Sequence, residues 1–450
     1  MNDLLHNAAT RAAQYLANAS QRPVAPGADA VDRLASLGGA LPDGPTDPDR
    51  VLALLDDAGS AATVAMAGPR YFGFVIGGTL PAALAATWLA SAWDQNAYSP
   101  VMSPAAATIE QIALDWMVDL LGLPQGTGAG FVTGGTMANF TALAAARHAL
   151  LARAGWDVEA NGLFGAPPIH VVVGDEVHVS LLKALSMLGI GRGHIIRVPV
   201  DSQGRMRADA LPPLNDSTLL CLQAGNVNTG AFDPAASILP TAHATGSWVH
   251  VDGAFGLWAA AAPARAHLME GYAGADSWAT DAHKWLNTPY DSGIAFVREP
   301  DHLRAAMSIS AAYLTESDTR MPGQYTPEMS RRARGVEVWA VLRSLGKSGL
   351  AELVERCCQH ANHFADGLRA AGYEVLNEVV LNQVLVAFGD ADTTQRVIAG
   401  VQRDGTCWCG GTVWQGRTAM RISVSSWATT EADVNQSLDA IIRVARAVTG

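Results

Sequence analysis

Short apolar runs that alternate with helical segments are the feature of this 450-residue chain that most constrains its fold. A strand-like run at 128–133 leads into a helix expected at 136–154, and further apolar runs lie at 169–173, 194–198, 219–223 and 248–251. These runs are rich in Val, Ile or Leu, as strands buried on both faces are. Short strands that alternate with helices predict a mostly parallel sheet in an α/β fold.

The regions on either side of these runs have different patterns. Residues 1–60 read as an N-terminal helical arm, residues 61–330 as a large α/β domain, and residues 331–450 as a small C-terminal α+β domain. The last region opens on a long helical stretch in which Gly346 and Gly349 are expected breaks. A chain of this length is expected to form more than one domain.

Composition and charge limit the partners of the chain. Hydrophobic residues make up 49% of the sequence and charged residues 16%, which favours large buried surfaces and is compatible with a subunit interface. A formal net charge of −12 disfavours binding to nucleic acid or to an anionic membrane. The long apolar stretches are interrupted by charges and the first residues lack the features of a signal peptide, so we expect a cytoplasmic protein.

The cysteines and the metal-binding residue types give no sign of a structural framework. Five cysteines are an odd number, and neither the C-x-C pair Cys407/Cys409 nor the adjacent Cys357 and Cys358 has the spacing of a metal site. We therefore expect reduced thiols and no metal ion.

The first motif with chemical content is Thr-Gly-Gly-Thr-Met-Ala-Asn at 133–139, where a strand end opens into a helix. Glycines let the backbone approach an anion, and the N–H groups at a helix N-terminus bind phosphate. Thr136 adds a hydroxyl donor. Alone, a Gly-Gly turn is more often a structural connector, and this one is neither a Walker loop nor G-x-G-x-x-G.

Two further residues lie where parallel-sheet folds place ligands. Asp252 follows the run at 248–251, and a carboxylate at that strand end needs a cation or hydrogen-bond donor unless it only caps the next helix. Lys284 stands between His283 and Trp285, close after an apolar strand. Burial would lower the pKa of such a lysine and make its amine a nucleophile for an aldehyde. A lone lysine would be read as a surface charge, but its order after the Gly-Gly turn and Asp252 favours chemistry.

At this point the sequence resembles a known family. HVDGAFG at 250–256, DAHKW at 281–285 and GDEVHVSLLKA at 174–184 are similar to motifs of the group II pyridoxal-5′-phosphate (PLP) decarboxylases, which include aromatic-L-amino-acid and glutamate decarboxylases. The strand that begins Arg421-Ile-Ser also fits, and the resemblance covers residues 65–445. It implies the fold-type I architecture: a large domain with a mostly parallel seven-stranded sheet between helices, and a small C-terminal α+β domain. It also implies a homodimer with the active site at the subunit interface.

The resemblance assigns cofactor-binding roles to individual residues. Lys284 would hold PLP as a Schiff base, Asp252 would keep the pyridine nitrogen protonated, and His178 would stack on the ring and approach the substrate carboxylate. For His178, a local hydrogen bond at a helix start is the structural alternative. The full set of implied cofactor contacts is Gly135, Thr136, His178, Asn228, Asp252, Ala254, Asp281, His283 and Lys284.

The chain departs from the family pattern near the ring. The family often has a Thr-Thr run there, whereas this chain has Gly-Asn-Val-Asn-Thr-Gly at 225–230 before Phe-Asp. Asn226, Asn228 and Thr229 all remain candidates for the polar contact that this run would make.

A second departure concerns the proton donor. Aromatic-amino-acid decarboxylases carry a donor tyrosine on a loop before an R-R-x-R helix, and that loop is short in this chain. Tyr325 is the candidate, with a plain turn residue as the alternative reading and His178 as the alternative donor. The identity of the donor leaves open whether the product is an amine or an aldehyde.

The segments that line the substrate pocket by resemblance carry Tyr71, Phe72, Phe74 and Tyr98. We expect Phe74 and Tyr98 to contact the substrate, Tyr98 from the partner subunit, although aromatic stripes are more often core. No Arg or Lys beside them indicates an acidic substrate, so aromatic or apolar amino acids are favoured.

The sequence as a whole therefore predicts a PLP-dependent carboxy-lyase that converts an L-amino acid to its amine and CO₂. A carbon–carbon lyase, an aldehyde-forming oxidative decarboxylase and an aminotransferase remain alternatives within PLP chemistry. A silent PLP-binding protein is the alternative outside enzymes.

Overall fold

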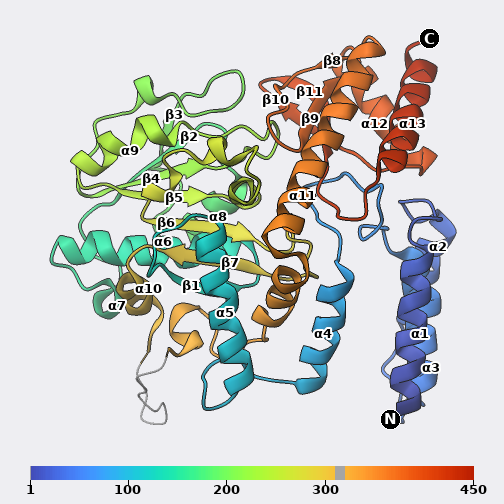
Figure 1. The fold of residues 1–450 in the computed structure, drawn as a ribbon, viewed down its shortest axis with the longest axis horizontal. Coiled ribbons are helices and arrows are strands. Elements are labelled where there is room, and N and C mark those ends of the chain that lie inside the picture. The colour runs from blue at the N-terminus through green and yellow to red at the C-terminus, as the bar shows by residue number, and fades with distance from the viewer. Residues whose placement is uncertain (1, 310–319) are drawn as a thin grey trace. The chain divides into compact units, whose positions relative to one another are not determined.

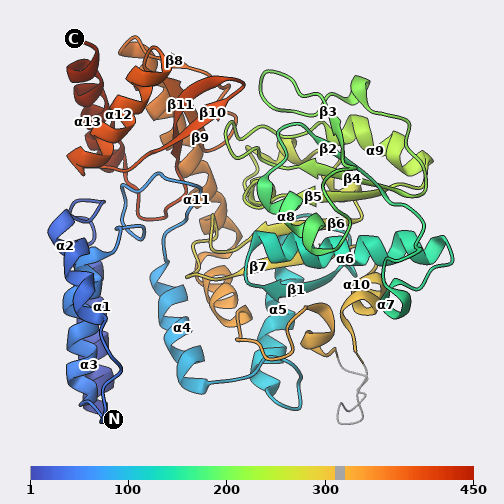
Figure 2. The same cartoon turned by 180° about the vertical axis from the view of Figure 1, so that it is seen from behind.

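The structure is a computed structural model that describes residues 2–309 and 320–450 (Figures 1 and 2). The chain divides into two compact units. The sheet unit comprises Thr79–Gln359 and Asn377–Gln383. The terminal unit comprises the chain up to Gly78 together with His360–Leu376 and Val384–Gly450.

The sheet unit is built on seven strands in the order β1-β7-β6-β5-β4-β2-β3. Their bounds are β1 Gly128–Val132, β2 His170–Gly174, β3 Ile196–Val198, β4 Thr218–Gln223, β5 Trp248–Asp252, β6 Ser277–Asp281 and β7 Gly293–Val297. Strands β3, β2, β4, β5 and β6 run parallel, while β7 is antiparallel to both of its neighbours. This confirms the expected mostly parallel seven-stranded sheet.

Helices that precede the sheet, lie between its strands or follow the last of them complete the sheet unit (Figure 1). They are α4 Pro81–Trp93, α5 Pro104–Leu120, α6 Gly135–Arg153, α7 Val158–Asn161, α8 Val179–Met187, α9 Ala235–Ala244 and α10 Pro300–Met307. Helix α6 packs against β5, β6 and β7 through a stripe that includes Ala138, Ala142 and Ala149, all fully or almost fully buried. Small side chains on that stripe let the helix backbone approach the sheet closely, which brings the first turn of α6 next to the strand ends.

The long helical stretch expected after residue 330 is helix α11, Gly335–Ala370. Its backbone leaves the helical conformation at Gly346, which has φ 60° and ψ −175°. This positive φ is accessible to glycine without the steric penalty of a Cβ atom. Gly349, the second expected break, lies inside the helix.

The terminal unit combines N-terminal helices with the C-terminal sheet. The helices are α1 Asn2–Asn18, α2 Ala28–Asp32, α3 Pro48–Leu55, α12 Ala391–Asp404 and α13 Glu431–Thr449. The strands are β8 Glu374–Val375, β9 Gln383–Ala387, β10 Gly410–Trp414 and β11 Arg417–Ser423, in the order β10-β11-β9-β8. Antiparallel pairs β10–β11 and β8–β9 agree with the expected α+β character of the C-terminal region.

Within residues 2–309 and 320–450, no helix is long and apolar enough to cross a membrane, and no cluster of His, Cys, Asp and Glu is arranged to hold a metal ion. All five cysteines are buried thiols outside any disulfide.

Candidate active site

Lys284 lies in the loop that follows β6, whose last residue is Asp281. Its Nζ atom is 2.9 Å from Asp281 Oδ2. The Asp281 side chain is only 2% exposed, whereas that of Lys284 is 21% exposed. The buried carboxylate therefore orients an amine that a small molecule can still reach.

His283 stands beside this ion pair. Its Nδ1 accepts a hydrogen bond from the backbone N–H of Ser292 at 3.2 Å, which places the proton of the neutral ring on Nε2. Nε2 is 3.6 Å from Asp281 Oδ1, and the ring stacks on Tyr290 with centroids 4.4 Å apart. Burial lowers the pKa of His283, so the imidazole is largely neutral near pH 7 and can act as a hydrogen-bond donor.

The Gly-Gly turn before α6 packs directly on these residues. Gly134 has φ 155°, and an added Cβ there would lie 3.0 Å from His283 Cε1. A Cβ on Gly135 would lie 2.8 Å from Asp281 Oδ2. Only glycines allow this approach, and it brings the first N–H groups of α6 to the Lys284 loop. Those N–H groups have no acceptor within their own helix, so the turn suits a phosphate group.

Asp252 ends β5, beside the strand that carries Asp281. Its Oδ1 accepts a hydrogen bond from the Ala254 N–H at 3.2 Å, and its Oδ2 accepts one from the Asn139 side-chain amide at 3.1 Å. The residue is 4% exposed, and within the described ranges no Lys, Arg or His forms an ion pair with it. A buried carboxylate held only by neutral donors suits a cationic ligand such as a protonated pyridine nitrogen.

His178 precedes α8 at the carboxyl end of β2. Its Nδ1 lies 2.7 Å from Ser180 Oγ and accepts the Ser180 N–H at 3.3 Å, so it does make the local bond of a helix start. In the neutral ring this arrangement leaves the proton on Nε2. The capping role is therefore compatible with a donor role for the other nitrogen.

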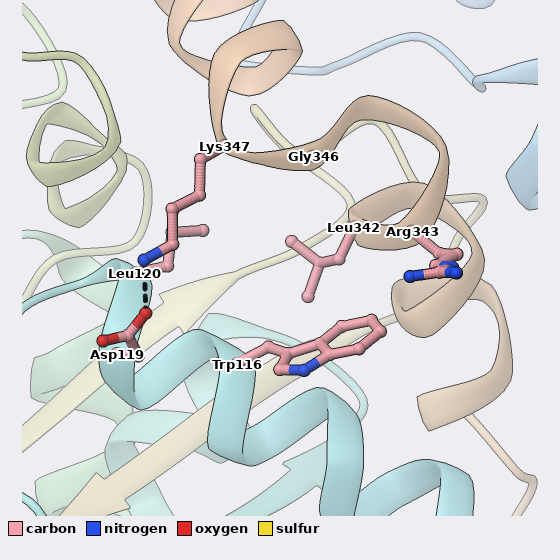
Figure 3. A pocket seen from close by; sticks show the side chains of 7 residues that line it. All are labelled: Trp116, Asp119, Leu120, Leu342, Arg343, Gly346 and Lys347. Atoms are coloured by element: carbon pink, nitrogen blue, oxygen red, sulfur yellow. Dashed lines mark hydrogen bonds and ion pairs between the residues drawn. The ribbon is translucent and has the colours of Figure 1, made fainter.

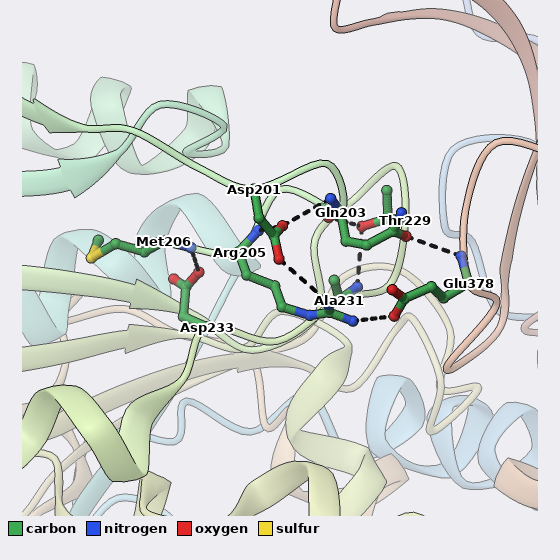
Figure 4. A network of polar contacts seen from close by, with 8 residues as sticks. All are labelled: Asp201, Gln203, Arg205, Met206, Thr229, Ala231, Asp233 and Glu378. Atoms are coloured by element: carbon green, nitrogen blue, oxygen red, sulfur yellow. Dashed lines mark hydrogen bonds and ion pairs between the residues drawn. The ribbon is translucent and has the colours of Figure 1, made fainter. Parts of the chain in front are cut away.

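The loop between β4 and α9 carries the three candidates for the polar contact with the ring. Asn226 Oδ1 accepts the N–H groups of Asn228 and Thr229, at 2.8 and 3.2 Å. Thr229 Oγ1 donates to Gln203 O at 2.7 Å and accepts from the Ala231 N–H (Figure 4). The side chains of Asn226 and Thr229 thus shape the loop itself, and the choice among the three candidates for the ligand contact stays a prediction.

The same network fixes this loop to two neighbouring segments (Figure 4). Asp233 accepts the backbone N–H of Met206 at 2.7 Å, and Gln203 Oε1 accepts that of Glu378 at 3.0 Å. Arg205 forms ion pairs with Asp201 and Glu378. The loop between β4 and α9 is therefore held by contacts to these two segments as well as by its own turn.

The role of Tyr325 as proton donor stays a prediction. Tyr325 ends the short helix η7, Pro322–Tyr325, where its ring packs against the core beside α10 and lies under the Arg320 guanidinium, 4.5 Å from Cζ. Its described contacts do not include Lys284, Asp281 or His178. Part of the preceding loop, residues 316–319, lies outside the described residues.

The two expected substrate contacts fall in different units. Tyr98 is 6% exposed and lies against Gly323 in the sheet unit, whose N–H donates to Tyr98 O at 2.9 Å. Phe74 is 60% exposed in the terminal unit, with its ring stacked on Trp408 at 5.7 Å. Their roles toward a substrate stay predictions.

Sequence reasoning did not single out Asn139, which touches Asp252 directly. It lies within the Gly-Gly motif, one helical turn after Gly135. Helical spacing places residues i and i+4 on one face, so the position of Asn139 four residues after Gly135 could have indicated that it faces the same site.

A groove elsewhere in the sheet unit lies between α5 and the break in α11 (Figure 3). Its lining residues are Trp116, Asp119, Leu120, Leu342, Arg343, Gly346 and Lys347. None of the expected cofactor contacts lines it, so it is not the candidate active site.

Known proteins resemble this chain along most of its length. Tryptophan decarboxylase 1 of Oryza sativa subsp. japonica is 29% identical over 80% of this chain and 77% of its own length. Phenylacetaldehyde synthase of a Rosa hybrid cultivar is 28% identical over 76% of this chain and 71% of its own.

A solved structure described as Oryza sativa TDC with PLP and tryptamine superposes with a TM-score of 0.91. It covers 100% of this chain and 98% of that one at 24% sequence identity, so it supports the fold.

The family described as "Pyridoxal-dependent decarboxylase conserved domain" matches residues 42–389. That range contains the Gly-Gly turn, Asp252 and the Lys284 loop, and its pyridoxal dependence agrees with the chemistry of their side chains. The expected cofactor and the expected enzyme class, a PLP-dependent carboxy-lyase, are confirmed, because the chain belongs to the pyridoxal-dependent decarboxylase family.

Proposed function

We propose that this chain removes the α-carboxyl group of an aromatic L-amino acid, with PLP held on Lys284, and releases the amine and CO₂. The observation that carries the proposal is the pairing of Lys284 with Asp281 beside a buried Asp252 on the adjacent strand, which forms no ion pair within the described residues. An amine for an aldehyde and a carboxylate for a pyridinium are the two groups that PLP chemistry requires. The likeness to a tryptophan decarboxylase supports the aromatic substrate.

Each side chain has a distinct task in this proposal. PLP, when bound, supplies an aldehyde for the substrate amine and a ring that accepts electrons from Cα. Gly135 and Thr136 would hold its phosphate, with His283 Nε2–H and Asp281 alongside. Asp252 would hold the proton on the ring nitrogen.

The remaining cofactor contacts border the ring. Ala254 follows Asp252 on the same strand end and would pack under the ring, where only a small side chain leaves room. Asn228 would make the polar contact from the β4–α9 loop. Asp281 Oδ2, 2.9 Å from Lys284 Nζ, would direct the amine toward the aldehyde.

For the proton donor we propose His178 in preference to Tyr325. His178 keeps its proton on Nε2, because Nδ1 is engaged by Ser180, and it stands at the carboxyl end of β2. The described contacts of Tyr325 are instead to the core and to Arg320. In this arrangement His178 Nε2 delivers the proton to the substrate Cα. Tyr325→Phe is expected to keep amine formation and His178→Gln to lose it beyond any loss of cofactor binding, with product analysis as the measurement.

The likeness to a phenylacetaldehyde synthase makes aldehyde formation the second candidate function. Here the carboxyl group is still lost, but O₂ takes two electrons from the substrate Cα before a proton reaches it, and hydrolysis by water then yields aldehyde, ammonia and hydrogen peroxide. The two candidates share every residue role given above except that of the proton donor.

The test is a screen of the twenty common amino acids with the PLP-loaded enzyme, in which CO₂, amine, aldehyde and peroxide are measured together. We expect CO₂ and one equivalent of amine with aromatic substrates. Aldehyde with peroxide would establish the second candidate, and glutamate formation from added 2-oxoglutarate would indicate an aminotransferase. No CO₂ from any amino acid would contradict both decarboxylase proposals.

We also propose that the working unit is a homodimer. Large apolar side chains are exposed on α4 and in the loop after it: Trp88 at 44%, Leu89 at 56%, Trp93 at 44%, Val101 at 78% and Met102 at 56%. Exposed apolar side chains grouped in one segment are typical of an interaction surface, and a second copy of the chain is the partner proposed here.

A further inference from the structure

Alternate residues of β5 place three polar side chains on one face of the strand. Successive side chains of a strand point to opposite faces, so Trp248, His250 and Asp252 share a face. Ser277 of β6 pairs in register with His250, and Asn139 of α6 reaches the same face. All five residues are 5% exposed or less.

These side chains form one continuous hydrogen-bonded chain. Trp248 Nε1 donates to Ser277 Oγ at 2.9 Å, and Ser277 Oγ lies 2.9 Å from His250 Nδ1. His250 Nε2 lies 2.9 Å from Asn139 Oδ1, and Asn139 Nδ2 donates to Asp252 Oδ2 at 3.1 Å. The chain thus begins at an indole that can only donate and ends at a carboxylate.

The donor capacity of each group fixes the direction of every bond. An ionised Asp252 only accepts, so the Asn139 amide must donate to it and present its oxygen to His250. A neutral His250 then carries its proton on Nε2 and accepts at Nδ1 from the Ser277 hydroxyl. Ser277 Oγ in turn accepts from Trp248. Every link has one donor and one acceptor, and reversing the Asn139 amide would set two oxygens against each other.

The hydrogen-bonded chain holds the Asp252 carboxylate without neutralising its charge. Burial lowers the pKa of His250 to about 3, so no positive charge reaches the carboxylate through this route near pH 7. Cys221 on the neighbouring strand β4 has its pKa raised by burial and by Asp252, so that thiol is also uncharged. Glu176 and Asp233 line the small cavity that Asp252 borders, and neither is a cation.

We propose that Asn139 and His250 are positioning residues that aim the Asp252 carboxylate at the ring nitrogen of PLP and keep its negative charge for that nitrogen. Helix α6 then serves both ends of the cofactor, with Gly135 at the phosphate and Asn139 one turn later behind Asp252. This inference rests on the proposed function, because it assumes PLP on Lys284.

The test compares the binding of PLP with that of 1-deaza-pyridoxal phosphate, an analogue with C–H in place of the ring nitrogen. The wild type should bind PLP more tightly than the analogue, by roughly tenfold to a hundredfold, the worth of a charge-assisted hydrogen bond. Asn139→Leu should lose most of this preference by weakening PLP binding while leaving analogue binding nearly unchanged. Thr141→Val is the matched control, since Thr141 is a buried polar residue of α6 that takes no part in this hydrogen-bonded chain.

Two results would overturn the inference. One is a full PLP preference in Asn139→Leu, and the other is an equal loss of affinity for both ligands, which would indicate a merely structural residue. If Asn139→Leu does not fold, His250→Gln and His250→Leu decide: the amide can donate to Asn139 and should keep the preference, whereas leucine should lose it. Equal preferences for PLP over the analogue in His250→Gln and His250→Leu would also contradict the proposed role of the hydrogen-bonded chain. Wild-type protein that binds neither ligand at Lys284 would instead refute the proposed function.

Discussion

Asp252 is the residue on which the proposed electronic role of the cofactor depends. It is buried, it accepts two hydrogen bonds from neutral groups, and it has no cationic protein partner among the described residues. Such a group stabilises a positive charge that belongs to the ligand, and removing a preorganised electrostatic partner is costly.

We therefore predict that Asp252→Asn lowers kcat by about 10²–10³-fold while the thermal unfolding temperature changes little. A neutral amide accepts hydrogen bonds but does not stabilise a protonated pyridine. Steady-state kinetics and thermal melts measure the two effects, with Asp209→Asn, an exposed partner of Arg207, as the control. Near-normal turnover in Asp252→Asn would make Asp252 only structural.

A second prediction concerns His250 and the stability of the folded protein at acid pH. Its pKa is about 3 in the folded protein and 6.5 in an ordinary environment, so below pH 6.5 the unfolded chain binds a proton that the folded chain does not. Stability from this residue is therefore complete above pH 6.5 and is lost as the pH falls toward 3, by up to roughly 5 kcal/mol.

The glutamine in His250→Gln does not titrate, so this variant should show a shallower loss of stability across that window. Denaturant unfolding at several pH values measures the slope for both proteins. Parallel slopes would show that His250 does not carry the acid dependence.

At the scale of elements, the turn from β1 into α6 determines where the proposed phosphate site lies. A Cβ on Gly135 would come within 2.8 Å of Asp281 Oδ2, so Gly135→Ala must displace either the turn or the carboxylate that orients Lys284. We predict a loss of PLP affinity of about tenfold or more, since one charge-assisted contact is worth that much. Gly193→Ala is the control, because its added Cβ meets nothing within 4 Å. Equal PLP dissociation constants in the two variants would contradict this account.

A buried ion cluster joins α5 to the segment before α11. Glu110 is 1% exposed and pairs with Arg331 at 3.0 Å and with Arg320 at 3.2 Å. Glu110→Gln leaves the buried guanidinium of Arg331 uncompensated, so the free energy of unfolding should fall by about 3–5 kcal/mol.

The exposed pair Lys347–Asp119 offers the contrast, and Lys347→Met should cost less than about 1 kcal/mol (Figure 3). Denaturant unfolding compares the two variants. A loss in Glu110→Gln as small as that in Lys347→Met would mean that the buried cluster contributes little.

The elements also show how far the sequence predicts the structure. Apolar runs predicted β2, β4 and β5 within a residue or two, because buried parallel strands need continuous Val, Ile and Leu. Strand β7, Gly293–Val297, was not expected, since its antiparallel place between β1 and β6 depends on contacts distant in sequence. The motifs that contain Lys284 and Asp252 are continuous in the sequence and could be recognised from it. The hydrogen bond from Asn139 to Asp252 spans 113 residues and becomes visible only once α6 packs on β5.

At the scale of the whole molecule, the proposed homodimer should depend on the apolar surface at residues 88–102. Trp88→Glu places a charge on that surface and should shift the protein toward monomer with loss of activity. Sedimentation at working concentration measures the shift, and Gly193→Ala again serves as control. An active monomer, in the wild type or the variant, would contradict the dimer.

The central claim is that this chain is a PLP enzyme whose cofactor is bound to Lys284. Borohydride reduction of the purified, PLP-loaded protein followed by peptide mapping tests it most directly. We predict a yellow protein whose visible absorption band disappears on reduction, with the pyridoxyl group on Lys284 alone. A label on Lys183 or Lys347, or no label on Lys284, would contradict the account.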